Sequence, residues 1–477
     1  MPIALPLFSF DDDEPTLPRA PVKVMISGLG LGGLMLAALL ERACIDYEIY
    51  EQADRYIRVG SAMALGPNLF PLFEQLGILT EILQLSKPVE KVEGYTEKLK
   101  LFLPVPYHHT EKFAGYLTRV IPHPDLYAVL AAQVPQSKIM WGKKIVHVQQ
   151  DNQGVTIGCT DGSMYRGEVL VGADGAHSGV RKSIYKELDQ RGELPRADRE
   201  DVHYNGVCLL GETKKLKPEK FPRLRDSTSS IQAVYGEKLP YYWATVTTPR
   251  DTICWFVIEF FDKNKIQTTE NIQRWKSQPA GDMCEALKHL PIPCGDKLTL
   301  VDLMEETSRE LLSKVMHEEK FFLTWHSNRV VLIGDACHKM SPAAGLGAVN
   351  AFQDAVVLAN HIHALPSSHV WTSDDIAVAF KGYKDERYLH AKYACDYSHN
   401  LGQLMGKSWT SEISRALVGK TPNWLWKVML RRVVAHRPQA SFLPQVHFQG
   451  GTPTASISSS VNLSDSDSIC DRHRQKT

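Results

Sequence analysis

The order of hydrophobic and polar residues predicts a chain that begins with strands alternating with helices. Short apolar, β-branched runs at Val22–Ser27, Asp46–Tyr50 and Val330–Ile333 are typical of buried strands. The first and last of these runs lead through glycines into apolar residues at helical spacing, at Leu34–Arg42 and Ala348–Asn360. Because strand–helix alternation of this kind builds a parallel sheet covered by helices, we predict a Rossmann-like α/β domain.

Residues 200 to 310 follow a different pattern. In Thr252–Phe261 apolar and polar residues alternate with period two, and strand-like runs also occur at Val207–Leu210 and Tyr241–Thr247. Such alternation is expected of an antiparallel sheet with one buried face. A helix is predicted at Thr269–Ser277. We therefore predict a mostly β substrate domain, residues 201–318, inserted between two parts of the α/β domain, residues 22–200 and 319–400.

The two ends of the chain differ from its middle. Residues 1–21 lack the positively charged start and long apolar core of a signal peptide, and we expect a flexible leader. A helical region is predicted at 401–447, and the Ser-rich residues 448–477 are predicted to be disordered. In the predicted helix Pro422–Arg437, basic residues gather opposite an apolar face. This indicates a helix on a membrane surface or, as we favour, one docked on its own protein.

Composition and charge exclude several classes of protein. Of the 477 residues 43% are hydrophobic, and the 54 basic residues equal the 54 acidic ones. Without a basic excess, nucleic acid is not an expected partner. The nine cysteines are scattered without a Cys-x-x-Cys pair, so we expect no metal site, no disulfide framework, and a reducing, intracellular and cytoplasmic location. The charge-free run Val24–Leu40 is short for a membrane span and contains four glycines, which favours a soluble fold.

The first strand runs into a Gly-x-Gly-x-x-Gly pattern formed by Gly28, Gly30 and Gly33. In a strand–helix turn the first glycine permits the sharp bend, the second lets a pyrophosphate approach the backbone, and the third lets the helix pack on the strand. The second strand ends at Glu51, 23 residues after Gly28, where a carboxylate would bind the adenosine ribose and repel a 2′-phosphate. These residues predict a dinucleotide-binding unit, with a plain βαβ unit as the alternative.

Two further strands each end in a short motif that contains a carboxylate. Asp174 could accept hydroxyl groups of a ligand or hold its own loop, and Arg181 could bind phosphate or pair internally. Asp335 ends the strand Val330–Ile333 and precedes the Pro/Gly-rich loop Pro342–Gly347, which leads into a helix whose N-terminus favours negative charge. Taken singly, each motif is equally compatible with an ordinary strand–helix connection.

The three signatures GLGLGG with Glu51, ADGAHSGVR and GDACHKMSPAAGLGAVNAFQDA, in this order, resemble those of class A flavoprotein monooxygenases of the p-hydroxybenzoate hydroxylase fold. The chain is similar in particular to fungal FAD-dependent monooxygenases and epoxidases of indole-diterpene and meroterpenoid secondary metabolism. The resemblance covers about Val22 to Asp396. It implies FAD as cofactor and O₂ as co-substrate. NAD(P)H would be a transient hydride donor, because a second glycine motif is not visible.

The resemblance also implies roles for individual residues. Gly28, Gly30 and Gly33 would face the pyrophosphate of FAD, and Glu51 would bind its adenosine ribose. Ala64, in a small-residue loop, would contact the cofactor through its backbone, and Asp174 and Arg181 belong to the second signature. Asp335 would bind the ribitol, with Pro342, Gly345, Gly347 and Ala348 along the isoalloxazine.

Two departures from the family pattern affect these assignments. The family usually places an arginine in an Arg-x-x-Leu pattern at the start of a helix, and the matching position before Leu126 is His123. Arg119 lies four residues earlier, so either His123 or Arg119 is expected to supply this cofactor contact. The common Gly-Gln-Gly of the third signature is Gly345-Leu346-Gly347 here.

The resemblance implies a reaction in which reduced flavin and O₂ form a C4a-hydroperoxide with an electrophilic distal oxygen. This oxygen would hydroxylate or epoxidise a hydrophobic small molecule beneath the inserted sheet. The sequence identifies no catalytic acid or base. His338 is expected to be structural, and Tyr241, Tyr242 and Trp243 either line the pocket or pack in the core.

Other functions compete with this interpretation. A flavin-dependent oxidase, dehydrogenase or reductase would share the same fold. A flavin-dependent halogenase is disfavoured because its Trp-x-Trp-x-Ile-Pro segment is absent from the sequence. From a different class, the chain could be a non-catalytic FAD-binding or membrane-surface protein that uses the basic C-terminal helix.

Overall fold

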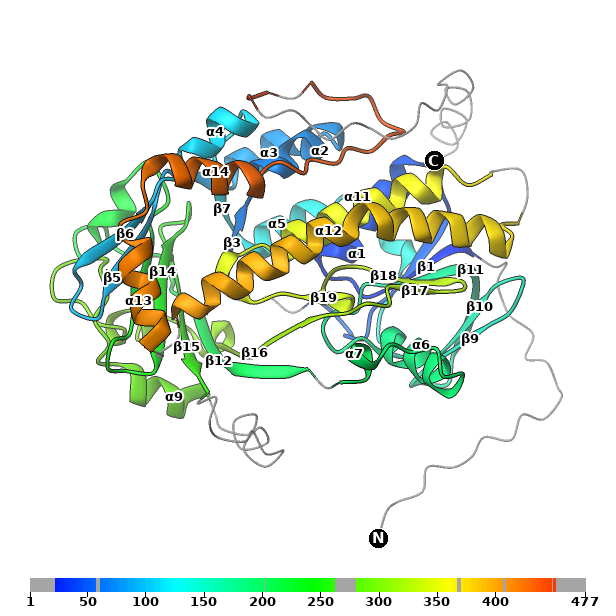
Figure 1. Cartoon of the computed structure of the whole chain (residues 1–477), viewed down its shortest axis with the longest axis horizontal. Helices are drawn as coiled ribbons and strands as arrows, with labels where there is room; N and C mark the ends of the chain where they lie inside the picture. The colour runs from blue at the N-terminus through cyan, green and yellow to red at the C-terminus, as the bar shows by residue number, and fades with distance from the viewer. Residues whose placement is uncertain are drawn as a thin grey trace, which may run out of the picture.

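The computed structural model describes residues 22–56, 61–200, 202–261, 280–366, 370–405, 409–447 and 449–451 (Figure 1). The predicted leader, the predicted helix Thr269–Ser277 and nearly all of the predicted tail lie outside the described residues.

A sheet of eight strands forms the base of the α/β domain. Its main order is β17-β18-β11-β1-β2-β8, and β10 and β9 follow from β11. The pairs β1–β2, β1–β11, β11–β18 and β2–β8 are parallel, which confirms the predicted Rossmann-like domain. The strands are β1 Val22–Ser27, β2 Tyr47–Tyr50, β8 Ile139–Met140, β9 Ile145–Gln150, β10 Val155–Cys159, β11 Met164–Gly172, β17 His326–Ser327 and β18 Val330–Leu332.

Four of the parallel strands end at the same edge of this sheet. Ser27 of β1 lies beside Tyr50 of β2 and beside Gly172 of β11, and Gly172 lies beside Leu332 of β18. The segments that follow these four positions therefore meet at one edge, although about 300 residues separate the first from the last. In open α/β sheets this edge, at the carboxyl ends of the strands, is where ligands bind.

Three helices pack beside one another on this domain. Helix α1 (Leu31–Arg42) contacts α11 (Gly347–His363), and α11 contacts α12 (Ser373–Met405), which runs on toward the inserted domain (Figure 1). Helices α1 and α11 approach each other closely at Gly32, since a methyl group there would lie only 3.3 Å from Cβ of Ala351. None of the described helices, α1 included, combines the length and the apolarity needed to cross a membrane.

The inserted domain is built on a second sheet of eight strands, in the order β19-β16-β12-β15-β14-β13-β5-β6. Most neighbours in this sheet are antiparallel, as the period-two alternation predicts, while β13 and β5 are parallel. The strands are β5 Val92–Thr96, β6 Leu101–Val105, β12 His203–Glu212, β13 Ile231–Tyr235, β14 Tyr241–Thr247, β15 Ile253–Phe260, β16 Ser313–Phe321 and β19 His338–Lys339.

The second sheet includes strands that lie outside the residues predicted for the inserted domain, 201–318. Strands β5 and β6 belong to it, although the sequence division placed them in the first part of the α/β domain. At the other end β16 continues to Phe321, and β19 adds a further strand. The difference arises because strand pairing joins residues that are distant in the sequence, and a local hydrophobic pattern does not record the partner.

The two faces of the inserted sheet belong to different clusters of buried residues. On one face Val207, Trp243 and Trp255 pack against α9 (Ala280–Leu287) and α10 (Val301–Met304). On the opposite face the neighbouring strand positions pack against the end of α12, against α14 (Asn423–Val433) and against Ala343. That face includes Tyr235, Tyr242, Ala244 and Ile258.

A small sheet and several short helices connect the two large sheets. The small sheet has the order β3 (Ala62–Leu65), β7 (Arg119–Pro122), β4 (Lys87–Pro88). The remaining helices are α2 Phe70–Gln75, α3 Leu79–Gln84, α4 His109–Ala114, α5 His123–Ala131, α6 Gly179–Gln190, α7 Arg196–Arg199, α13 Trp409–Val418 and α14 Asn423–Val433. Helix α14 buries Trp426 and Leu430, as a helix docked on its own protein does.

A buried ionic network joins the turn after β18 to α11 and α12. The carboxylate of Asp354 accepts hydrogen bonds from the backbone N–H of Gly334 at 2.9 Å, from Nε2 of His338 at 2.6 Å and from Nε of Arg387 at 2.8 Å. Asp354 and Arg387 are fully buried. Burial alone would raise the pKa of Asp354, but His338 and Arg387 lower it to about 2. The network therefore holds a charged, buried carboxylate within the third signature.

We expect Asp354→Asn to lower the free energy of unfolding by about 3–5 kcal/mol, because it leaves the Arg387 guanidinium buried without its anion. Urea denaturation followed by circular dichroism measures the change. The matched control is Asp385→Asn on α12, which removes an exposed pair with Lys381 and should leave the urea midpoint unchanged. An Asp354→Asn protein as stable as the unsubstituted one would contradict the role given to this network.

Candidate functional site

The glycine loop after β1 is shaped by close backbone contacts. Gly28 has a φ angle of +101°, and a methyl group there would lie 2.6 Å from the carbonyl oxygen of Ala173. A methyl group at Gly33 would lie only 2.1 Å from the carbonyl oxygen of Gly28. Both positions therefore require glycine for the turn and for the packing of α1 on β1, as the motif predicts.

Gly30 differs from these two glycines. A methyl group there would meet no heavy atom of the described residues within 4 Å, so open space lies in front of it. Gly30 is also the N-cap of α1 and offers no side chain to the free N–H groups of the first turn. Open space beside an uncapped helix N-terminus fits a pyrophosphate, because the N–H groups and the helix dipole both favour an anion there.

Glu51 directs its carboxylate to the same loop. Its Oε2 accepts a hydrogen bond from the backbone N–H of Leu29 at 2.7 Å, and its Oε1 accepts one from the N–H of Ala53 at 2.8 Å. Each carboxylate oxygen has a second lone pair, so two positions remain for hydroxyl groups. The backbone thus holds Glu51 where the dinucleotide motif requires a ribose-binding acid.

Asp174 follows β11 at the shared edge of the sheet. Its Oδ2 accepts hydrogen bonds from the N–H groups of Gly179 at 2.8 Å and Val180 at 3.2 Å, which hold the start of α6. Its Oδ1 is buried and has no hydrogen-bond partner among the described residues. Burial raises the pKa of this carboxyl, against the lowering effect of the Ser178 side chain and of the backbone N–H groups. An orphaned oxygen at this edge can accept a hydroxyl group of a ligand.

Arg181 joins the second signature to the third. It is 5% exposed, and its guanidinium donates to the carbonyl oxygens of Ala336 at 2.8 Å and Ala176 at 2.6 Å. Its Cζ lies 4.1 Å from the ring centroid of Phe322. Of the two roles left open by the sequence, these contacts support internal pairing, since the described partners are backbone carbonyls and an aromatic ring.

Asp335 and the loop behind it lie at the N-terminus of α11. The carboxylate of Asp335 is half-exposed and accepts a hydrogen bond from Nζ of Lys339 at 2.7 Å. A methyl group at Gly347, the first residue of α11, would lie 3.9 Å from its Oδ1. The N-cap residue Leu346 provides no side-chain hydrogen bond. Asp335 therefore borders a second uncapped helix N-terminus.

The third signature also approaches the small sheet. Gly345 adopts a φ angle of +66°, and a methyl group there would lie 4.0 Å from Cβ of Ala64. Ala64 is not in a loop, as the sequence suggested, but in β3, where it pairs with Val120. Two small-residue segments that the sequence predicts to lie along a flat ligand are thus in contact with each other, although they are 281 residues apart.

Arg119 and His123, the two candidates for the missing arginine contact, have different surroundings. The guanidinium of Arg119 donates to Oγ of Ser86 at 2.7 Å and to the carbonyl oxygens of Ser86 and Leu83, so it ties β7 to the end of α3. Nδ1 of His123 is buried without a hydrogen-bond partner among the described residues, and burial lowers the pKa of its imidazole. His123 is the better placed of the two to contact a ligand.

The third signature also contains a cluster of possible metal ligands. Atoms of Cys337, His338 and Asp354 that could bind a cation lie within 4.8 Å of one another. These groups are already engaged, however: His338 is hydrogen-bonded to Asp354, and the Cys337 thiol contacts the carbonyl oxygens of Leu332 and Gly334. Burial raises the pKa of the Cys337 thiol well above its usual value, which disfavours the thiolate that a metal requires. The contacts support a structural role for His338.

Two residues of β16 join the inserted sheet to the signatures and were not identified from the sequence. Nε2 of His317 lies 3.1 Å from Oγ of Ser341, which caps the turn at Pro342. The buried Glu318 lies 3.5 Å from Nε2 of His177 in the second signature. Burial lowers the pKa of His317 to about 4, so its ring is neutral at pH 7. The sequence contains no local signal for these pairs, since each joins distant segments.

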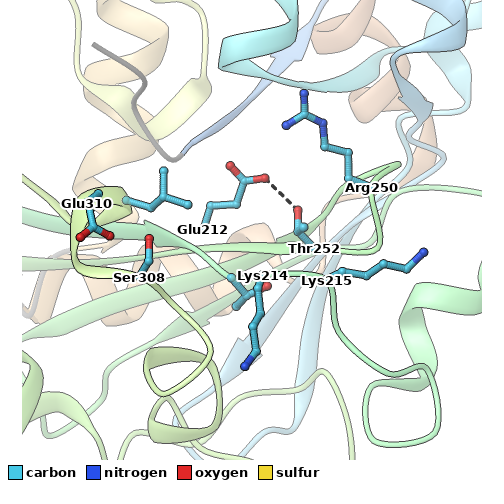
Figure 2. A pocket seen from close by; sticks show the side chains of 9 residues that line it. Glu212, Lys214, Lys215, Arg250, Thr252, Ser308 and Glu310 are labelled. Atoms are coloured by element: carbon cyan, nitrogen blue, oxygen red, sulfur yellow. Dashed lines mark hydrogen bonds between the residues drawn. The ribbon is translucent and has the colours of Figure 1, made fainter.

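A cavity of about 550 Å³ opens at the end of β12 beside the inserted sheet (Figure 2). Its lining is charged: Lys214, Lys215 and Arg250 supply cations, and Glu212 and Glu310 supply carboxylates. Glu212 is 2% exposed and accepts a hydrogen bond from Oγ1 of Thr252 at 2.9 Å, drawn as a dashed line in Figure 2.

The cavity adjoins the start of α5. Arg250 is paired with Asp125, two residues after His123, so one wall of the cavity is tied to the helix that begins at that histidine. This contact joins the cavity wall to α5, a pairing of distant segments that the sequence alone does not show.

Comparison with known proteins gives one family for this fold and site. The family described as FAD binding domain matches residues 21–206 and 266–394, which together make up more than half of the chain. The chain belongs to this family, and it is an FAD-dependent monooxygenase, as the three signatures predicted. FAD is accordingly its cofactor.

Fungal relatives support this assignment. The chain is 27% identical over 385 residues to the FAD-dependent monooxygenase pyr5 of Aspergillus fumigatus, covering 77% of this chain and 78% of the relative. It is 28% identical over 382 residues to the FAD-dependent monooxygenase paxM of Penicillium paxilli, covering 78% and 76%. These names confirm the predicted relation to fungal FAD-dependent monooxygenases.

Solved structures confirm the fold. HpxO of Klebsiella pneumoniae, complexed with FAD and uric acid, superposes with a TM-score of 0.67 at 18% identity, covering 87% of this chain and 96% of the other. PqsL of Pseudomonas aeruginosa, in complex with 2-aminobenzoylacetate, superposes with a TM-score of 0.63 at 22% identity, covering 84% and 100%.

The surroundings of Gly30 and Gly33 predict that substitution by alanine affects FAD binding at the first position and stability at the second. Gly33→Ala should lower the free energy of unfolding by about 1–3 kcal/mol, because its methyl group meets the backbone of Gly28. Gly30→Ala should leave the urea midpoint of the FAD-free protein unchanged and weaken FAD binding at least about tenfold, since it fills the space in front of α1. Equal effects of the two variants on stability would contradict this division.

Proposed function

We propose that this monooxygenase uses NAD(P)H and O₂ to hydroxylate or epoxidise a hydrophobic small molecule. In such a reaction one atom of O₂ enters the substrate and the other leaves as water, while NAD(P)H supplies two electrons. The observation that carries the proposal is the meeting of four strand ends at one edge of the sheet, since the segments that contain Gly30, Glu51, Asp174 and Asp335 follow these ends.

In this proposal different residues hold the adenosine diphosphate part, the ribitol and the isoalloxazine of FAD. The loop of Gly28, Gly30 and Gly33 with Glu51 holds the adenosine diphosphate part, and Asp335 accepts hydroxyl groups of the ribitol. Ala64 and the turn from Pro342 to Ala348, which includes Gly345 and Gly347, lie along the isoalloxazine. Arg181 acts by joining two of these segments, and His123 replaces the usual arginine. Asp174 contributes its free Oδ1.

Bound FAD supplies the chemistry of oxygen activation. The chain contributes electrostatics and shelter. The N-terminus of α11, which begins at Gly347, carries partial positive charge and has no side-chain cap, so it would stabilise negative charge on a reduced flavin beside it. Exclusion of water from the space under the inserted sheet would protect the activated oxygen for transfer.

The face of the inserted sheet that packs with Ala343 supports a hydrophobic substrate. Tyr235 and Tyr242 contribute rings with centroids 5.1 Å apart in an edge-to-face arrangement, and Phe256 lies beside them. Tyr242 and Trp243 of β14 point to opposite faces, so the structure separates two residues that the sequence could not distinguish. Of these, we assign Tyr242 to the substrate side.

The purified protein tests the reaction directly. We expect bound FAD, visible as yellow colour, and consumption of NAD(P)H with uptake of O₂ that rises with a suitable hydrophobic substrate. A colourless protein that does not bind added FAD would overturn the proposal. FAD without NAD(P)H oxidation across a broad substrate panel would favour a flavin oxidase or a non-catalytic carrier.

A cytoplasmic location with peripheral membrane contact through the C-terminal helix belongs to the same proposal. Seven of the described cysteines, among them Cys159, Cys208 and Cys337, carry free thiols, which suits a reducing compartment, whereas Cys44 is disulfide-bonded, contrary to the expectation from the sequence. Exposed apolar side chains on α14, next to basic ones, support a contact with a membrane surface.

Asp335→Ala is expected to weaken FAD binding at least about tenfold, because hydrogen bonds to a charged acceptor contribute about 1.5–3 kcal/mol each. Fluorescence titration of the FAD-free protein with FAD measures this effect. Lys339→Met is the matched control, since it removes the partner of Asp335 and keeps the carboxylate; a smaller change is expected. Full FAD occupancy in Asp335→Ala would contradict the assigned role.

A further inference from the structure

The last two helices carry exposed apolar and basic side chains on their outer side. Among the apolar ones, Ile413 is 52% exposed, Leu417 66%, Trp424 65% and Val428 44%. These four apolar side chains lie within 16 residues of chain, interspersed with exposed basic residues. We call this outer side the C-terminal face; it comprises Ile413, Leu417, Lys420, Trp424, Lys427, Val428, Arg431 and Arg432.

Apolar and basic residues are interleaved on this face. In α14 Trp424, Lys427, Val428 and Arg431 follow at spacings of three, four and seven residues, which places them on one stripe of the helix. All four are exposed. A stripe of this composition lets apolar groups enter the boundary between lipid headgroups and acyl chains while the cations remain at the headgroups.

The charge of this segment is one-sided. From Ile413 to Arg437 the chain contains six basic residues and no acidic one, whereas the whole chain has 54 of each sign. Within α14 the exposed cations Lys427, Arg431 and Arg432 therefore have no acidic residue in their own helix, whereas α13 contains Glu412. Such a surface is complementary to an anionic one, and each cation near an anionic membrane contributes about a fivefold increase in binding.

The inner side of the same helices is fixed to the protein. Nη1 of Arg415 donates to the carbonyl oxygen of Leu404 at 2.9 Å, and Oδ1 of Asn423 lies 2.6 Å from Nε2 of His109 in α4. Trp426 is 7% exposed. These contacts fix the orientation of α13 and α14 beside β5 and β6 (Figure 1). The helices therefore cannot turn their exposed apolar side chains inward without breaking these contacts.

We propose that the C-terminal face binds an anionic membrane surface. Its helices are amphipathic, they lie at the outside of the molecule, and their exposed residues pair an interfacial tryptophan with cations. The inner side of α14 packs with Tyr242 and Ala343, so, if the proposed function holds, membrane binding sets the substrate side of the inserted sheet beside the lipid. A substrate dissolved in the membrane is the class of molecule that this arrangement serves.

Flotation of the purified full chain with vesicles tests the membrane contact. We expect the protein to float with vesicles of phosphatidylcholine containing 30% phosphatidylserine, and to float at least about tenfold less with phosphatidylcholine alone. Binding should decrease at 0.5 M NaCl, since salt screens exposed charges. The assay does not depend on turnover, so a protein that binds vesicles but does not oxidise NAD(P)H would support the contact while contradicting the proposed reaction.

Two variants and a control locate the surface. Lys427→Glu with Arg431→Glu should reduce vesicle binding at least about tenfold, given about fivefold for each cation. Leu417→Ser with Trp424→Ser should reduce it by a similar factor. The control is Val378→Ser with Leu389→Ser, which removes two apolar side chains of α12 that are 73% and 74% exposed and should change nothing.

Other outcomes would overturn the proposal. No flotation with phosphatidylserine vesicles, in a protein whose circular dichroism and FAD content show it to be folded, would exclude the contact. A concentration-dependent dimer that Lys427→Glu with Arg431→Glu dissociates would assign the face to a second copy of the chain. Equal loss of binding in the α12 control would show that general surface hydrophobicity, not the C-terminal face, drives binding.

Discussion

The buried carboxylate of Asp354 is the constraint on which the site depends. It binds the N–H of Gly334, the ring of His338 and the guanidinium of Arg387, and so connects the turn after β18 to α11 and α12. A charge in this interior is tolerated only because its partners satisfy it. Since Gly334 immediately precedes Asp335, the network also positions the proposed ribitol ligand against the N-terminus of α11.

A second constraint, the register of the parallel sheet, brings the pieces of the site together. Ser27, Tyr50, Gly172 and Leu332 end four strands at one edge, so the glycine loop and the three acids that follow them belong to segments that meet there. Arg181 then joins two of these pieces directly through the carbonyl oxygen of Ala336. The cofactor site is therefore assembled from short local motifs by long-range pairing, which is typical of open α/β sheets.

The inserted sheet divides its residues between stability and function. Trp243 packs with α9 and α10, and its neighbour Tyr242 packs with Ala343 and the C-terminal helices. His317 and Glu318 on β16 reach the third and second signatures, respectively. The same sheet thus builds a core on one face and meets the cofactor loop on the other, while α13 and α14 close its side.

The sequence by itself determined the fold class, the cofactor and the order of the three signatures, because glycine spacing and hydrophobic period reflect local backbone geometry. It also predicted Gly28, Gly30, Gly33, Glu51 and Asp335 as cofactor residues, and the segments that carry them follow strands that end at one edge of the sheet. Only the tertiary structure decided which pairings form: β5 and β6 join the inserted sheet, Arg119 binds the end of α3, and His317 meets Ser341. These outcomes depend on contacts between distant segments, and a local pattern does not contain the identity of a distant partner.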